Sequence, residues 1–434
     1  MTALAPGLHR NVQIRLVVTF FLRLLSVMTL PLLAIFFAAT LGPVRAGLLL
    51  AVSVAAATGC AILGGHLADA RGRRGTLLIT EPGITLTFLG MALADSSVLH
   101  SPMLVYVFFL INGCLASMGL AAGDAIVMDT VTPENRARIY TRRYWSTNLA
   151  VSLGATAGAL LYQHHFSLVL WGGTVLTGCV YLATVLFVAE TSPGRRGLEQ
   201  GRQRAREWLG DLTRGYRVAL ADRIFTQYLI ACIMITTVES QLAYYIGVHL
   251  ALTFGTQTLL SAGSLHVVVD GVRMAGIVRT EGALLVFVAL FVTKRLFRSM
   301  PDRLQMNLGI AVFTLGFMAL AVARNGWLLL SFSVVYTLGE LMNVPIRQVL
   351  MVDIIDPRMR AKYIALYSLR PRAAAILASL GIVAGSVIGP WGMAALYAVC
   401  GATAIALLRR PWDAVPERAE RFARPLGEAA AEAT

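Results

Sequence analysis

Residues 65–74 read GHLADARGRR, a short polar stretch that follows one long apolar run and precedes another. Gly65 has no side chain and lets two helices approach closely, while Gly72 permits a tight turn. Asp69 can accept hydrogen bonds from the end of a neighbouring helix. The stretch therefore predicts a charged latch that breaks and reforms when the surrounding helices move; the alternative is a basic loop that only sets membrane orientation. The residues expected to form the latch are Gly65, Asp69, Arg71, Gly72, Arg73 and Arg74.

The composition around this stretch is that of a membrane protein. Of the 434 residues, 57% are hydrophobic and 14% charged, and the mean hydropathy is +0.70. A soluble domain does not tolerate such a surface, whereas about 20 apolar residues cross a bilayer as one helix. The sequence therefore predicts an all-α integral membrane protein with twelve spans. They lie at about 15–41, 44–67, 76–95, 102–128, 144–163, 167–189, 224–247, 279–297, 307–323, 327–351, 363–388 and 390–408.

The basic residues indicate how the chain is oriented. The net charge of +14 comes from short stretches between the apolar runs and not from one solvated face, which argues against a nucleic-acid partner. Basic residues cluster after the second, fourth, eighth and tenth predicted spans, so the positive-inside rule places both termini in the cytoplasm. Lysine is nearly absent, which is typical of a GC-rich bacterial genome. The expected location is therefore the bacterial inner membrane.

Motifs for catalysis, metal binding and nucleotide binding are missing from the sequence. HExxH, GxSxG and GxxxxGK[ST] do not occur, and no cysteine spacing suits zinc. We therefore expect a protein that is not an enzyme, holds no metal or other cofactor, and takes its energy from the proton gradient. The cysteines all lie in apolar runs and are interpreted as packing residues: Cys60, Cys114, Cys179, Cys232 and Cys400.

A polar stretch at about 190–223 divides the predicted spans into two sets of six. Its middle is either an amphipathic helix on the inner membrane surface or a solvated linker. One loop design recurs in both halves at the same spacing: Asp129, Pro133 and Arg136, then Asp353, Pro357 and Arg360. Such a repeat predicts two six-helix bundles related by an axis along the membrane normal. The expected organisation is a bundle at 1–189, a cytoplasmic linker at 190–223, a bundle at 224–408 and a cytoplasmic tail at 409–434.

Residues 65–74 resemble the G-x-x-x-D-x-x-G-R-R loop signature of the major facilitator superfamily. Further positions are similar to its drug:proton antiporters, especially the lactococcal multidrug antiporter type: Tyr144-Trp145, Asn148-Leu149, Gly154, Gly158, Tyr336-Thr337-Leu338-Gly339-Glu340 and Pro345. The resemblance implies a major facilitator fold of two six-helix pseudo-symmetric bundles, in which acidic membrane residues bind protons and cationic drugs. The matching acids here are Asp69, Asp129 and Glu340. At two further acidic positions of that family this chain carries Arg143 and Ala243, and Glu239 precedes the latter by one turn.

Glu340 is the main candidate for proton coupling on physical grounds as well. An ionised carboxylate near the middle of a membrane helix costs at least about 2.5 to 3.5 kcal/mol unless it is paired, neutral or facing water. A carboxyl group there can hold a proton and release it when a cation arrives, although a structural hydrogen bond between helices is the alternative. Arg347 lies seven residues further on the same helix face, so we expect it to balance Glu340 or to join the cytoplasmic gate.

Three further intramembrane groups complete the candidate site. Arg23 can pair with an acid or attract an anionic substrate group. Asp124 can bind a proton or form a structural ion pair with Arg23 or with a polar residue of the fifth span. Glu239 has Tyr244 nearby, and aromatic walls beside a carboxylate suit an organic cation; an interfacial aromatic belt is the alternative.

These residues predict a secondary transporter that exports amphiphilic cationic or zwitterionic molecules in exchange for protons by alternating access. The alternative is a proton-coupled importer or lipid transporter of the same fold, with an anionic group bound by Arg23. Besides the latch, the residues expected to gate the movement are Asp129, Arg347 and Asp353. The expected partners are a small-molecule substrate, protons and membrane lipids, and the expected state is a monomer.

Overall fold

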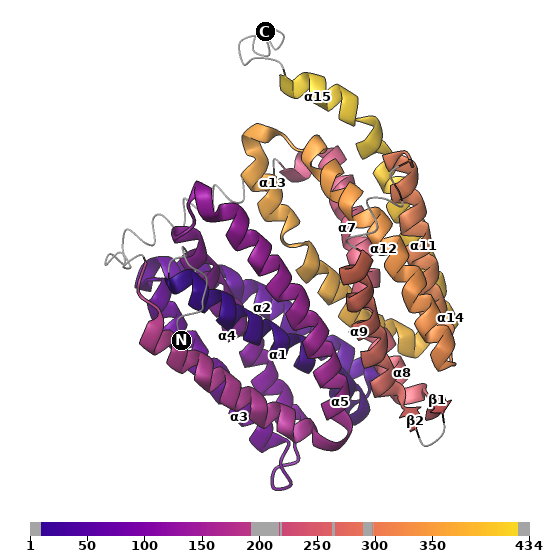
Figure 1. Cartoon of the computed structure of the whole chain (residues 1–434). Coiled ribbons are helices and arrows are strands. Elements are labelled where there is room, and N and C mark those ends of the chain that lie inside the picture. Colours follow the sequence, from indigo (N-terminus) through magenta and orange to yellow (C-terminus); the bar gives the residue numbers. More distant parts are fainter. Residues whose placement is uncertain are drawn as a thin grey trace. The chain divides into compact units, whose positions relative to one another are not determined.

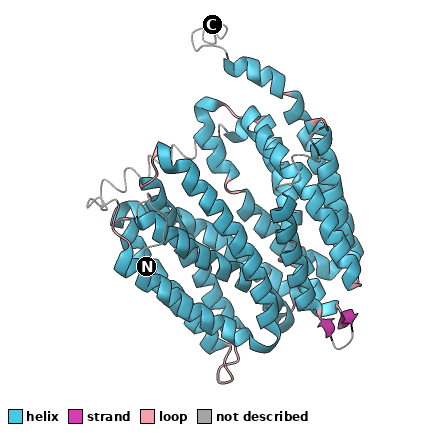
Figure 2. Ribbon diagram, viewed as in Figure 1, coloured by secondary structure: helices cyan, strands magenta, loops and turns pink. Residues whose placement is uncertain are grey.

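Long helices make up most of the protein (Figures 1 and 2). The computed structural model describes residues 10–191, 217, 219–262, 265–289, 297 and 299–423. Within this described part, nine helices are long and apolar enough to cross a bilayer. The length and hydropathy of these helices support the prediction of an all-α membrane architecture.

The first half of the chain forms five helices with short connections. They are α1 (Arg10–Leu41), α2 (Pro43–Arg71), α3 (Arg73–Ala94), α4 (Pro102–Asp129) and α5 (Pro133–Phe187). Ser101 caps α4, because its hydroxyl accepts a hydrogen bond from the amide of Leu104. The helix bounds agree with the predicted spans to within about five residues, apart from α5.

Helix α5 contains both the fifth and the sixth predicted spans. Ile139, near its start, packs against Val12. Ala189, just after its end, exchanges two hydrogen bonds of 3.0 Å with the side chain of Asn11. Both ends of α5 therefore lie at the first turn of α1, which requires the helix to double back on itself, as Figure 1 shows. The two predicted spans are the two arms of α5.

The second half of the chain is less regular. It begins with α7 (Arg223–Ser240), α8 (Tyr245–Thr253), the antiparallel strands β1 (Gln257–Ala262) and β2 (Leu265–Val269), and α9 (Gly271–Ala289). It continues with α11 (Asp302–Val322), α12 (Gly326–Ile354), a 3-10 turn (Pro357–Met359), α13 (Arg360–Tyr367), α14 (Arg370–Asp413) and α15 (Val415–Ala423). Counting the two arms of α5 and of α14 separately, and adding α9 to the apolar helices, gives the twelve predicted spans.

Three elements of this half differ from the prediction. The seventh span, expected to be continuous over 224–247, is interrupted by turns at residues 241–244 between α7 and α8. The hairpin of β1 and β2, which follows α8, is absent from the prediction. The prediction rests on apolar runs long enough to span a bilayer, and strands of six and five residues are too short to appear as such runs. Helix α15 occupies part of the predicted tail. By contrast, α14 changes direction at Gly389, where φ is 66°, as the predicted boundary between residues 388 and 390 requires.

The described residues form two compact units. The first contains the described residues within 1–205, 242–283 and 379–387, and the second those within 206–241, 284–378 and 388–434. In the first unit, Gly47 of α2 approaches α14 so closely that a Cβ would lie 2.7 Å from the carbonyl oxygen of Ser379. The predicted linker at 190–223 lies mostly outside the described residues, and the division of the chain at that linker stays a prediction.

Candidate functional site

In the first unit, Asp69 and Arg73 of the predicted loop form an ion-pair cluster with Asp129 and Glu190, and these four residues make up the observed latch. Arg73 donates from Nη1 to Oδ1 of Asp69 at 2.6 Å, and its Nε lies 3.4 Å from Oδ2 of Asp129. The same Nη1 also donates to the carbonyl oxygen of Ala68 at 3.2 Å. Arg73 thereby connects the end of α2 with the end of α4, so that any relative movement of these helix ends must break an ion pair.

Glu190 is a member of the latch that the sequence did not reveal. Its carboxylate accepts hydrogen bonds from the backbone amides of Arg73 and Arg74, both at 3.0 Å, and of Gly75 at 3.4 Å. These amides are the free donors of the first turn of α3, where the helix dipole favours a negative charge. The available signal was a single carboxylate directly after a long apolar run, at the first residue of the predicted linker.

The glycines of the loop divide differently from the prediction. Gly72 adopts φ 91° between α2 and α3, which confirms that it makes the tight turn. The close helix contact, however, is made by Gly64 and not by Gly65. A Cβ on Gly64 would lie 2.4 Å from the Cα of Met118 in α4, whereas a Cβ on Gly65 would meet nothing within 4 Å. The physical reason is helix rotation, because adjacent residues point about 100° apart around a helix.

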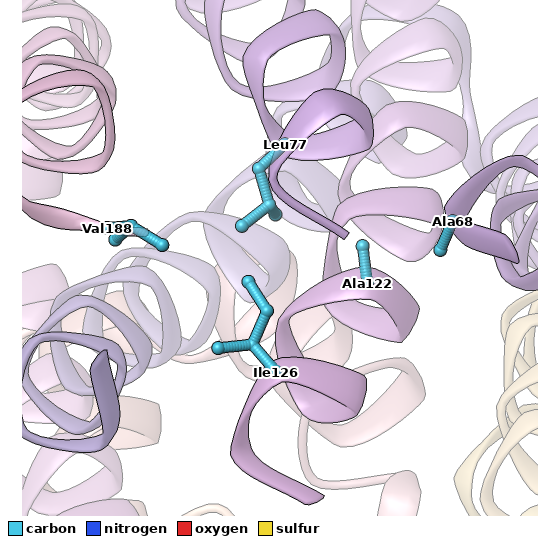
Figure 3. Packing of buried hydrophobic residues seen from close by; sticks show 5 residues of the cluster. All are labelled: Ala68, Leu77, Ala122, Ile126 and Val188. Carbon is cyan, nitrogen blue, oxygen red and sulfur yellow. The ribbon is translucent and has the colours of Figure 1, made fainter. Parts of the chain in front are cut away.

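A small apolar cluster supports the latch from inside the unit (Figure 3). Its side chains come from α2, α3, α4 and the residue after α5, and Ile14 of α1 packs against them. Every member is buried, which fixes the helix ends from which the latch residues project. The cluster consists of Ala68, Leu77, Ala122, Ile126 and Val188.

Asp124 and Arg23 do not pair with each other. Asp124 accepts from Nη2 of Arg143 at 2.8 Å, so its partner comes from the helix that carries the fifth predicted span. The Arg23 side chain is exposed, and it makes no ion pair among the residues that the structure describes. Arg143, which stands where the resembling family has an acid, therefore neutralises Asp124 in this chain.

A buried ion pair close to the latch was not predicted. Nη1 of Arg15 donates to Oε1 of Glu81 at 3.0 Å, and both side chains are 3% exposed. Gly123 of α4 makes room for the guanidinium, because a Cβ there would lie 2.1 Å from Nη2 of Arg15. The available signal was Glu81 itself, an acid well inside the third predicted span.

In the second unit, Glu239 and Glu340 form a carboxylate pair with Arg347. The two carboxyl groups are close enough to repel each other electrostatically, and the Arg347 guanidinium attracts both. Arg347 is only 4% exposed, while Glu340 is half-buried and Glu239 exposed. Arg370, which sequence analysis did not single out, also acts on Glu239. The unit thus brings two acids and two bases together, with the acids partly open to solvent.

Arg347 is held in place by its backbone more than by its side chain. Its carbonyl oxygen accepts from the hydroxyl of Tyr228 at 2.7 Å, and Tyr228 stacks on Tyr367 with ring centroids 6.0 Å apart. Within the described residues, Nε and Nη1 of the guanidinium have no hydrogen-bond partner. A guanidinium with two unused donor nitrogens can donate hydrogen bonds to a carboxylate or to a substrate group that reaches it.

The remaining candidates are less connected. Tyr244, 4% exposed, belongs to the first unit, where it precedes α8. Asp353 and Arg71 are exposed and make no ion pair within the described ranges. Three of the basic residues that follow the eighth predicted span, Lys294, Arg295 and Arg298, lie outside those ranges. Among the described residues, no group of three or more His, Cys, Asp or Glu side chains could hold a metal ion.

Comparison with known proteins finds transporters. The family profile described as Major Facilitator Superfamily matches residues 16–377. A "Na(+), Li(+), K(+)/H(+) antiporter" of Planococcus maritimus is 30% identical over 380 residues, which cover 86% of this chain and 89% of that protein. "Multidrug resistance protein MdtH" of Salmonella newport (strain SL254) is 24% identical over 384 residues, 88% of this chain and 85% of that protein.

Solved structures of low sequence identity share the fold. A POT family transporter in complex with a thioalcohol conjugated peptide gives a TM-score of 0.71 at 15% identity and covers 94% of this chain and 96% of that one. A D-xylose-proton symporter gives a TM-score of 0.67 at 13% identity, over 93% of this chain and 98% of that one. These likenesses concern the fold alone. They confirm the predicted twelve-helix architecture, and the matched proteins are transporters, not enzymes, as predicted.

Proposed function

This chain belongs to the major facilitator superfamily, and from this premise we propose that it is a proton-coupled antiporter that exports cations. The observation that carries the proposal is the carboxylate pair of Glu239 and Glu340 beside the buried Arg347. Glu239 and Glu340 repel each other, and Arg347 shares its one positive charge between them, so we assign to the pair one proton or one substrate cation at a time. The pair therefore holds a proton when it is empty.

The exchange follows from this electrostatics. A substrate cation that reaches the site supplies the missing positive charge and favours loss of the proton to the side where proton concentration is low. Return of a proton from the other side releases the cation by the same competition. The guanidinium of Arg347 already compensates part of the negative charge of Glu239 and Glu340. The site therefore takes up only one further positive charge at a time, either a proton or a monovalent substrate cation.

The names of two relatives support exchange of a cation for protons, and they suggest two classes of transported cation. One relative is named as a multidrug resistance protein, and the resemblance of several motifs to drug:proton antiporters favours amphiphilic cations or zwitterions. A second candidate function is exchange of alkali cations for protons, favoured by the relative at 30% identity, which is named as a Na(+), Li(+), K(+)/H(+) antiporter. The acids are compatible with either class.

The latch is the proposed gate of the conformational change. Arg73 bridges Asp69 and Asp129 at the ends of α2 and α4, and Glu190 holds the start of α3. Breaking these contacts permits the helix ends to separate, and reforming them closes the same side. The proposed setting is the bacterial inner membrane, with both termini in the cytoplasm and a monomer as the working unit.

The test uses inverted membrane vesicles energised with a proton gradient. Gradient-driven uptake of a fluorescent cationic dye is compared with collapse of the gradient on adding NaCl, LiCl or KCl, for wild type, Glu340→Gln and Glu239→Gln. Asp413→Asn is the matched control, since this carboxylate is 60% exposed and pairs with Arg303 at the surface. Loss of exchange in both glutamine variants, with the control active, supports the proposal. Exchange by wild type of neither cation class contradicts it.

The dye and salt arms separate the two cargo classes. Dye uptake without a response to salt assigns the drug-like class, and the reverse assigns alkali cations. Arg23→Gln is included because its exposed guanidinium would serve the importer alternative. If Arg23→Gln exchanges cations at the wild-type rate, binding of an anionic group by Arg23 is not required for transport.

A further inference from the structure

Helices α2 and α4 run side by side in the first unit along a close seam. Near one end of the seam, the hydroxyl of Tyr106 in α4 donates to the carbonyl oxygen of Leu49 in α2 at 3.1 Å. Further along, a Cβ on Gly113 would lie 3.8 Å from the Cβ of Ala57. At the other end, Gly64 of α2 approaches Met118 of α4 still more closely, as described above. The two helices are therefore in parallel register over this whole stretch.

Cys60 and Cys114 face each other in the middle of this seam. Cys60 lies three residues after Ala57 and four before Gly64, hence on the same helix face. Cys114 follows Gly113 and precedes Met118 by four residues. The register of the seam therefore places the two thiols next to each other, and both side chains are partly exposed. They are thus two adjacent thiols accessible to a small reagent.

We propose that Cys60 and Cys114 form a two-coordinate binding site for a divalent thiophilic cation of the Hg2+ type. Soft metal ions select thiolate ligands, and ions that accept two ligands in a line need no third residue. Within the described chain no third His, Cys, Asp or Glu completes a larger ligand set, which excludes ions that require three or four protein ligands.

Charge favours a divalent ion at this depth in the membrane. Each thiol loses its proton to water, two metal–sulfur bonds replace two metal–chloride bonds, and no electron is transferred. The product of a divalent ion with two thiolates is neutral, whereas a monovalent ion would leave one net negative charge in the apolar region. The site is separate from the carboxylate pair, because it belongs to the first unit and the carboxylates to the second.

The experiment titrates the purified full-length protein with HgCl2. Thiol alkylation is then mapped at each cysteine by mass spectrometry, and metal–thiolate charge-transfer absorption is recorded in parallel. One equivalent of Hg2+ is expected to protect Cys60 and Cys114 together while leaving the exposed Cys179 open to alkylation. In Cys60→Ser, Cys114 should lose its protection and the absorption should disappear, whereas Cys179→Ser should behave as wild type.

Two results would overturn the site. One is protection spread over all accessible thiols at one equivalent; the other is equal protection of Cys114 with and without Cys60. The wild-type map needs no variant, and thermal unfolding of Cys60→Ser shows whether a lost signal reflects lost folding. Since cation exchange plays no part in the readout, failure here leaves the antiporter proposal standing, and failure of the antiporter test leaves this site standing.

Discussion

Arg15 of α1 and Glu81 of α3 form an ion pair inside the first unit, with Nη1 and Oε1 3.0 Å apart and both side chains 3% exposed. Neither partner is fully satisfied: among the described residues, Nε of Arg15 and Oε2 of Glu81 lack hydrogen-bond partners. Attraction in a buried pair repays the loss of hydration only when both charges are present. The pair therefore joins α1 to α3 next to the latch, and it makes each charge dependent on the other.

Replacing one partner should destabilise the protein far more than replacing both. Arg15→Met leaves a buried, uncompensated carboxylate and should cost about 3 to 5 kcal/mol of unfolding free energy, while Arg15→Met with Glu81→Met should recover most of that loss. Thermal unfolding in detergent measures the effect. Arg303→Gln is the control, because the Arg303–Asp413 pair is 48% and 60% exposed and should contribute less than about 1 kcal/mol. Equal losses in the single and double variants would contradict this account.

Gly64 and Gly65 should respond in opposite ways to alanine. In Gly64→Ala the new Cβ meets the Cα and carbonyl oxygen of Met118 at 2.4 and 2.9 Å, so the helices must separate at a cost of about 1 to 3 kcal/mol. In Gly65→Ala the Cβ meets nothing within 4 Å, and the gain in helix propensity should stabilise the protein by up to about 1 kcal/mol. Unfolding temperatures of the two variants test this directly. A larger loss in Gly65→Ala would restore the assignment made from the loop motif.

The lengths of the apolar runs predicted the membrane spans, and Gly72 predicted the turn between α2 and α3. Neither feature predicted which charged residues form ion pairs. Run length reports that a segment crosses the membrane, and glycine reports where the backbone turns. It does not reveal which residue lies opposite: Glu190 is 117 positions from Arg73, and Glu81 is 66 positions from Arg15. To predict whether Gly64 or Gly65 contacts α4, the rotation of α2 about its own axis must be known to within about 100°. A membrane helix that is apolar on all sides has no polar face that would indicate this rotation.

Asp222 should make stability depend on acid pH. It caps α7, and both its oxygens accept from Arg418 of α15, at 2.6 and 3.0 Å. Burial acts to raise its pKa, but the hydrogen bonds and charge of Arg418, with those of Phe225 and Tyr363, bring the pKa of Asp222 below its ordinary value. A lowered pKa in the folded state means stabilisation that is complete above the unfolded pKa of about 3.9 and lost as pH falls below it.

Asp222→Asn therefore tests the sign of this effect. Asparagine still caps the helix but leaves Arg418 without its counter-charge, so we expect a loss of about 1.5 to 3 kcal/mol at neutral pH. The difference in unfolding temperature between wild type and variant should stay constant from about pH 7 to pH 5 and shrink below about pH 4. A difference that is independent of pH would assign the stabilisation to shape and not to charge.

Asp69 and Glu190 should separate the gating role of the latch from its structural role. The Asp69 carboxylate is 72% exposed and pairs with Arg73 one turn away, a contact worth about 0.3 to 0.5 kcal/mol, so Asp69→Asn should leave unfolding almost unchanged. If the pair must reform in each cycle, exchange should still slow by about tenfold, the effect of about 1.4 kcal/mol on a barrier. Glu190→Gln removes the charge that holds three amides at the start of α3 and should lower stability by about 0.5 to 2 kcal/mol as well. Transport rates in vesicles and unfolding temperatures are measured for both variants. An Asp69→Asn variant that is stable but transports slowly supports a gating role for Asp69. An Asp69→Asn variant that transports at the wild-type rate shows that Asp69 is only a surface charge.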